Sequence, residues 1–141
     1  MVPKKKLLEL RLKNPATERG KVLSALKTFA SKHQLPASAV NAADLALEEH
    51  LTNLSKHAYQ DKGLQYILVR FAVRRGRFVI EVLDDGKPFN PLQVPPVDTS
   101  KPLGEKPIGG LGIHLIRHFM DDLKYHRKGS KNVLTMRKNL A

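Results

Sequence analysis

Two runs of alternating apolar residues, joined by a short basic turn, restrict the fold of this chain more than any other feature. Apolar residues alternate with others over 67–73 and again over 78–82. Between the runs stands Arg74-Arg75-Gly76-Arg77, a segment typical of a tight turn. Alternation places one side of each strand in a core and turns the other side outward. The sequence therefore predicts an antiparallel hairpin with one buried face.

Apolar spacing predicts the remaining elements and their order. Alternation indicates strands, and apolar residues three and four apart indicate helices. The expected elements are a strand at 5–13, a helix ending near Gln34, a long helix at 38–60, a helix at 111–122, and strands at 123–127 and 133–136. The 141 residues predict one domain, 1–141, with no internal repeat. The fold class is an α/β sandwich (α+β), with helices on one face of a mixed, mostly antiparallel sheet.

The composition indicates which cellular compartment and which classes of binding partner to expect. Lys and Arg number 25 against 13 acidic residues, a formal net charge of +12. Such a charge favours an anionic partner, namely a nucleotide, a nucleic acid or an acidic protein, although a merely soluble surface is an equal interpretation. The chain has no cysteine and no apolar run long enough to span a membrane. We therefore expect no membrane partner and a cytoplasmic location.

The segment Glu49–Asn53 places a carboxylate and a carboxamide four residues apart on the long helix. Residues at this spacing share a helix face. A carboxylate at the margin of a core can act as a general base, and a carboxamide oxygen can coordinate Mg²⁺. Taken alone, an ordinary solvated helix face is the simpler interpretation.

Two further segments point to a nucleotide, although each has a plainer explanation. Asp84 closes a predicted strand and could accept a hydrogen bond from an exocyclic amine, while Gly86 would let a ring approach closely. Taken alone, an ordinary turn is the simpler interpretation of Asp84-Asp85-Gly86. Gly110 and Gly112 open the helix at 111–122, where free backbone N–H groups can bind phosphate, but a simple hinge fits as well.

The three segments occur in an order that resembles a known superfamily. They are similar to the N, G1 and G2 boxes of the GHKL ATPases, which share the Bergerat ATP-binding fold. The resemblance is closest to the anti-sigma factor serine/threonine kinases. It rests on Ala46–Tyr59, Leu83–Pro91 and Gly109–Tyr125, with a last strand at Asn132–Lys138.

The resemblance implies a role for each candidate residue. Asn53 would ligate the Mg²⁺ that bridges the ATP phosphates, and Glu49 would orient or deprotonate the attacking hydroxyl. Asp84 would hold the adenine amine. The remaining ATP contacts implied are Gly86 at the base, Gly110 and Gly112 at the phosphates, and Thr135 near the adenine. The proline-rich stretch at about 92–108 would be the ATP lid.

The implied function is an ATP- and Mg²⁺-dependent kinase in a transcription switch. It would phosphorylate a serine or threonine of an anti-anti-sigma protein with a STAS fold, and it would sequester a sigma factor, often as a homodimer. The alternative is a non-catalytic module that uses bound nucleotide only to shape a protein-docking surface. The presence of Glu49 favours catalysis.

Two other functions fit the residues less well. The first is the ATPase domain of a histidine kinase. Such a kinase also needs a helical phospho-acceptor domain, and this chain is too short to include one. A nucleic-acid binder would need a basic helix or an aromatic stacking platform, and aromatic residues make up only 6% of the chain. A direct nucleic-acid partner is therefore not expected.

Overall fold

The computed structural model describes residues 7–14, 17–55, 66–93 and 116–140. Within them the strands are β1 (Leu7–Leu12), β2 (Ile67–Arg74), β3 (Arg77–Asp84), β4 (Asp122–Lys128) and β5 (Lys131–Asn139). The helices are α1 (Arg19–His33), α2 (Ala37–Asn53) and the short 3-10 turn η3 (Pro91–Gln93). Residues 116–119 are also helical. These elements follow the predicted order.

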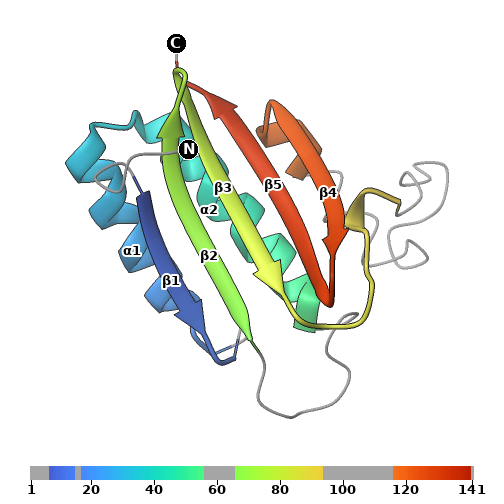
Figure 1. The fold of residues 1–141 in the computed structure, drawn as a ribbon. Coiled ribbons are helices and arrows are strands. Elements are labelled where there is room, and N and C mark those ends of the chain that lie inside the picture. Colours follow the sequence, from blue (N-terminus) through green and yellow to red (C-terminus); the bar gives the residue numbers. More distant parts are fainter. Residues whose placement is uncertain (1–6, 15–16, 56–65, 94–115, 141) are drawn as a thin grey trace, which may run out of the picture.

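The described strands form one sheet in the order β1-β2-β3-β5-β4. Each neighbouring pair is antiparallel, so the part of the sheet described contains none of the parallel pairing that a mixed sheet would have. Helices α1 and α2 lie behind the sheet on one face, and no helix of the described residues lies on the other face (Figure 1). This arrangement confirms the predicted α/β sandwich.

The hairpin predicted first is the β2–β3 pair, and its turn has two residues. Arg75 and Gly76 have φ angles of 54° and 74°, both in the left-handed region. A two-residue turn of this kind matches the twist of the strands that it joins. The turn fixes the register, because Arg74 then pairs with Arg77 and Ile67 pairs with Asp84 at the far end.

The core fills the space between the helices and the sheet. Rings of Phe29, Phe71 and Phe78 meet there with centroids 5.7 to 5.9 Å apart. Leu47 and Leu51 of α2 belong to the same buried cluster, as the apolar stripe predicts. This packing holds α2 against the sheet, so its last turn is fixed relative to the strands.

Three predicted boundaries differ from the structure or lie outside it. The long helix predicted to reach 60 is described as α2 to Asn53 with a wider turn at 54–55, and residues 56–60 lie outside the described residues. The helix predicted to end at Asp122 is over by Met120, because the backbone N–H of Asp121 already donates to Arg137 in β5. Asp122 therefore begins β4. Of the predicted lid only its first residues, in η3, are described.

In the part of the chain that the structure describes, no helix is both long and apolar enough to cross a bilayer.

Candidate functional site

All of the predicted site residues that are described, except Thr135, belong to elements that meet at one end of the sheet. The end of β3, the start of β5 and the C-terminal turn of α2 all lie at the lower end of the molecule in Figure 1. Asp84 is the last residue of β3, and Glu49 and Asn53 lie on the last two turns of α2. The core contacts of α2 hold the two elements in this arrangement.

Asp84 is a buried carboxylate with fixed partners. Its side chain is 1% exposed, and its Oδ1 accepts hydrogen bonds from the Gly86 backbone N–H at 3.0 Å and from Asn132 Nδ2 at 2.9 Å. Among the described residues both bonds go to Oδ1, which leaves Oδ2 able to accept from a ligand amine. The pair of bonds also fixes the direction in which the carboxylate faces.

The charge state of Asp84 reflects two opposed effects. Burial raises the pKa of this carboxyl above its usual value, because the charged form loses its hydration. The hydrogen bonds from Asn132 and Gly86, together with the Arg127 guanidinium, act in the other direction and favour the carboxylate. Arg127 also donates to the Gly86 carbonyl at 2.9 Å, so the same side chain holds the turn after β3.

Asn132 is a functional candidate that sequence reasoning missed. It pairs with Asp84 in the sheet, is 3% exposed, and faces the helices. Besides donating to Asp84, its Nδ2 donates to the Lys87 carbonyl at 2.9 Å. Its Oδ1 accepts from the Phe89 backbone N–H at 3.2 Å and from Tyr125 Oη. The available signal was a polar residue that opens an apolar run directly after a glycine turn.

Thr135 lies on the other face of the sheet. Residues directly opposite each other on neighbouring strands share a face, and Thr135 pairs with Glu81, whereas Asn132 pairs with Asp84. Positions 132 and 135 are an odd number of residues apart, so they face opposite sides. The structure therefore does not bring Thr135, predicted to lie near the adenine, to the other described site residues. The β5 residue that lies beside Asp84 is Asn132.

Asn53 and Glu49 differ in burial. Asn53 is 4% exposed, and its Nδ2 has no hydrogen-bond partner among the described residues. A buried amide with an unsatisfied donor costs free energy unless a ligand engages it. Glu49 is half-buried one turn earlier, at the spacing that places both side chains on one helix face.

His50, which carried no signal in the sequence, is also buried beside this pair. It is 2% exposed, and neither ring nitrogen has a partner among the described residues. Burial lowers the pKa of His50 to about 4, so the ring is neutral at pH 7. The remaining predicted residues, Gly110 and Gly112, lie outside the described residues.

Comparison with known proteins assigns this chain to a family. The model of the histidine kinase-like ATPase domain matches residues 13–138. The chain belongs to the histidine kinase-like ATPase family. The described strands, helices and site residues all fall within the matched range, apart from β1 and the last residue of β5.

Relatives of this chain include proteins named serine-protein kinase RsbW. Serine-protein kinase RsbW of Bacillus mycoides is 34% identical over 96 residues, which cover 64% of this chain and 59% of that protein. Serine-protein kinase RsbW of Listeria monocytogenes is 29% identical over 116 residues, which cover 79% of this chain and 74% of that protein. The match thus spans about three fifths of the first of these relatives.

A solved structure supports the fold. The RsbU and RsbW domains of Rv1364c from Mycobacterium tuberculosis superpose with a TM-score of 0.64 at 14% identity. The superposition covers 94% of this ATPase domain and 32% of that chain. At this identity the likeness establishes the architecture, which confirms the predicted Bergerat-type sandwich.

Proposed function

We propose that this chain is an ATP- and Mg²⁺-dependent kinase that phosphorylates a serine or threonine of an anti-anti-sigma (STAS) protein and sequesters a sigma factor. The observation that carries the proposal is the buried Asp84 carboxylate, held at the end of β3 with one oxygen left for a ligand. The relatives named serine-protein kinase support the protein substrate.

The adenine end of the site is built from β3 and β5. In the proposal Asp84 accepts the hydrogen bond of the adenine amine through Oδ2, and the buried Gly86 lines the base. Asn132 is a positioning residue here, because its amide orients the carboxylate and ties down the loop after β3. A buried, correctly oriented acceptor discriminates strongly against a base that lacks the amine.

The metal end of the site is built on α2. Asn53 fits a Mg²⁺ ligand, because its carboxamide oxygen is a neutral hard ligand atom. Its buried amide nitrogen, which lacks a partner among the described residues, would then be able to donate to a phosphate oxygen. Bound Mg²⁺ would neutralise charge on the ATP phosphates. No group of three acidic or histidine side chains in the described residues could hold the ion alone, which suits an ion shared with phosphates. Gly110 and Gly112 remain the predicted phosphate contacts.

Glu49 is the residue on which transfer depends. Its half-buried carboxylate can accept the proton of the partner's hydroxyl or orient that hydroxyl toward the phosphate. Glu48 precedes it on the same helix but is exposed and forms a surface ion pair with Arg19 at 2.8 Å. The two neighbouring glutamates therefore form a matched pair for testing.

The test is phosphate transfer from labelled ATP to a purified STAS partner, with ATP binding measured separately by calorimetry. We expect Glu49→Gln to lower transfer at least about 100-fold and to leave ATP affinity unchanged, because a general base contributes to the transition state. Glu48→Gln should behave like the parent chain. Asp84→Asn should instead weaken ATP binding itself, by about tenfold or more, because it turns an acceptor into a donor.

Three results would test the base assignment, the kinase activity and the sequestration of a sigma factor separately. Transfer by Glu49→Gln at the parent rate would remove the base assignment. ATP binding by the parent chain without label on any STAS partner would favour the non-catalytic docking module. Co-elution of the chain with a sigma factor, released when unphosphorylated STAS protein is added, would support sequestration. The same chromatography would test the predicted homodimer.

A further inference from the structure

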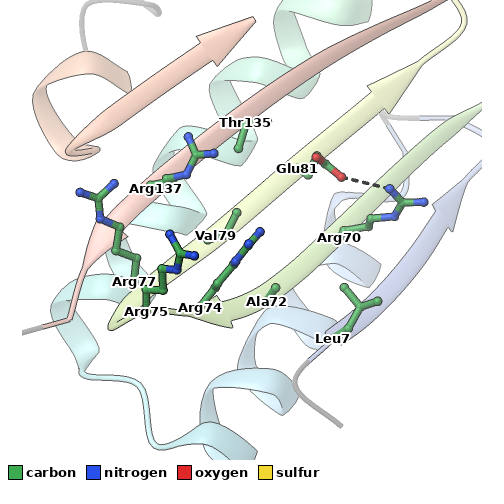
Figure 2. Close-up of a pocket in the computed structure, with 10 residues that line it drawn as sticks. All are labelled: Leu7, Arg70, Ala72, Arg74, Arg75, Arg77, Val79, Glu81, Thr135 and Arg137. Atoms are coloured by element: carbon green, nitrogen blue, oxygen red, sulfur yellow. Dashed lines mark hydrogen bonds and ion pairs between the residues drawn. The ribbon is translucent and has the colours of Figure 1, made fainter. Parts of the chain in front are cut away.

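The helix-free face of the sheet carries a groove with a volume of about 570 Å³. Five arginines line it, namely Arg70, Arg74, Arg75, Arg77 and Arg137 (Figure 2). We call it the arginine groove. It lies on the face opposite the core, around the β2–β3 turn, whereas Asp84 lies at the other end of β3. Among the described residues predicted to contact ATP, Thr135 lines the groove, from the face of the sheet opposite Asp84.

The register of the strands explains why the face is hollowed. Arg74 and Arg77 are opposite each other at one end, and Arg70 and Glu81 are opposite each other four residues along. Between these two rows lie the short side chains of Ala72 and Val79, which also face each other. Long side chains on either side of short ones leave a trough with an apolar floor.

Three arginines at the turn are free to meet a ligand. Arg74, Arg75 and Arg77 are exposed, and none of them forms an ion pair with another described residue. By contrast, Arg70 pairs with Glu81 at 3.0 Å and Arg137 pairs with Asp122 at 2.7 Å. The free positive charge is therefore concentrated at the end of the groove nearest the turn.

This arrangement costs stability within the chain itself. Like charges directly opposite each other on neighbouring strands repel, and Arg74 faces Arg77 in this way. Arg75 occupies a left-handed conformation, at a φ of 54°, that Gly, Asn or Asp adopts more readily. Local rules of this kind are broken most often where a protein binds something. An anion between the arginines would relieve the repulsion.

We propose that the arginine groove docks an acidic segment of a partner protein. Carboxylates of the segment would pair with Arg74, Arg75 and Arg77, since a guanidinium binds a carboxylate through two parallel hydrogen bonds. Aliphatic parts of the segment would cover Ala72 and Val79. This site is independent of the nucleotide and of phosphate transfer.

The lining favours a protein segment over the other polyanions. No aromatic ring lines the groove among the described residues, so nucleic-acid bases would find no stacking platform. The Glu81 carboxylate at the far end would repel a continuous phosphate backbone. A second copy of this chain is disfavoured as well, because the described residues that line the groove include only one carboxylate, Glu81, and this is already paired with Arg70.

The test measures binding of a fluorescein-labelled peptide that alternates glutamate and leucine, by fluorescence anisotropy with the full chain at physiological salt. The test variant is Arg74→Gln/Arg75→Asn, in which Asn suits the left-handed turn position and keeps the hairpin folded. The matched control is Lys27→Gln/Lys32→Gln, which removes the same charge from exposed positions on α1 behind the sheet.

We expect the test variant to lose affinity about tenfold or more, since two charge-assisted contacts are removed, and the control to stay within about twofold. Far-UV circular dichroism would show both variants folded. Equal losses in the two variants would overturn the proposal in favour of bulk charge. It would also be overturned by equal binding of a glutamine-leucine peptide, or by no binding of the acidic peptide. Tighter binding of a single-stranded oligonucleotide, lost in the test variant, would reassign the groove to nucleic acid.

Discussion

Asn132 shows how one side chain can organise a site. Its amide bonds four other segments or side chains: the end of β3, the loop after it, Tyr125 and Arg127. A buried amide has two donors and can accept at both lone pairs of its oxygen, and here each is used. The residue therefore determines both the orientation of Asp84 and the path of the loop after β3.

Replacing Asn132 should damage stability and binding together. We expect Asn132→Ala to lower the free energy of unfolding by about 1–3 kcal/mol, because buried partners lose their hydrogen bonds. ATP affinity should fall as well, because Asp84 loses its orienting donor. Urea denaturation and calorimetry would measure the two effects. Asn139→Ala, at an exposed position of the same strand, is the control and should change stability by less than about 0.5 kcal/mol. Equal effects of the two substitutions would contradict the assignment.

His50 should make the domain sensitive to mild acid. Its pKa is about 4 in the folded chain against 6.5 when exposed, so the unfolded chain takes up a proton first as the pH falls. The contribution of neutral His50 to the free energy of unfolding is fully present above pH 6.5. It falls by about 1.4 kcal/mol per pH unit as the pH drops from there to about 4. Asp84 acts in the opposite sense as the pH falls toward 3.8, because its raised pKa makes the folded chain take up that proton before the unfolded chain does.

The measurement is urea denaturation of the parent chain and of His50→Leu at pH 7 and pH 5. Leucine is similar in size, apolar and uncharged, so the variant should lose less stability between the two pH values. The difference between the two slopes isolates His50 from the other titrating groups. Parallel slopes would show that protonation of His50 does not oppose folding.

At the scale of elements, α2 is held by its apolar stripe. Leu47 is 2% exposed within the core, whereas Leu45, two residues earlier, is 42% exposed. We expect Leu47→Ala to lower the free energy of unfolding by about 2–5 kcal/mol, through lost burial and the cavity that remains. Leu45→Ala makes the same chemical change on the solvent side and should cost less than about 1 kcal/mol. Similar costs, measured by urea denaturation, would contradict the packing of this helix.

The elements could be predicted because their patterns are local. Alternation in 67–73 and 78–82, the Gly-containing turn between them and the leucine stripe of α2 each follow from a few neighbouring residues. Their order then implied a sheet with helices on one face, and the family's ordered segments indicated Asp84, Asn53 and Glu49. These predictions required no knowledge of which strands are neighbours.

The features that could not be predicted depend on pairing across the chain. The placement of Asn132 beside Asp84 is set by the register of β3 against β5, two strands far apart in sequence. Over 132–136 every residue is buried, so alternation no longer distinguishes the two faces. Thr135, which was predicted to lie near the adenine, is on the face of the sheet opposite Asp84. The arginine groove was missed for the same reason, since its rows exist only once β2, β3 and β5 are aligned.

At the scale of the whole molecule, the sheet separates two chemically different faces. Asp84 and Asn132 lie on the helix side at one end of β3, and the free arginines lie on the open side around the β2–β3 turn. From Arg77 to Asp84 the strand β3 spans about 23 Å at the rise typical of a strand. Sites so far apart and without shared partners should act independently.

Independence is measurable with variants from each site. Asp84→Asn should leave affinity for the acidic peptide unchanged, and Arg74→Gln/Arg75→Asn should leave ATP affinity unchanged. In the combined variant, the ATP affinity should match that of Asp84→Asn and the peptide affinity that of Arg74→Gln/Arg75→Asn, each within about 0.5 kcal/mol. A larger coupling energy, measured by calorimetry and anisotropy in the four chains, would mean that the sheet transmits binding from one face to the other.

The contact between Asp84 and Asn132 joins residues 48 positions apart. Closing a loop of that length costs conformational entropy, which is offset only when the strands of the sheet have paired. We therefore expect this contact to form late, because contacts between residues far apart in sequence form slowly. Because a ribosome releases the N-terminal part first, β1 to β3 leave it well before β5. A nascent chain can thus form its hairpin and both helices while it still lacks the partner of Asp84. Any recognition of a base by that carboxylate has to wait for the last strand.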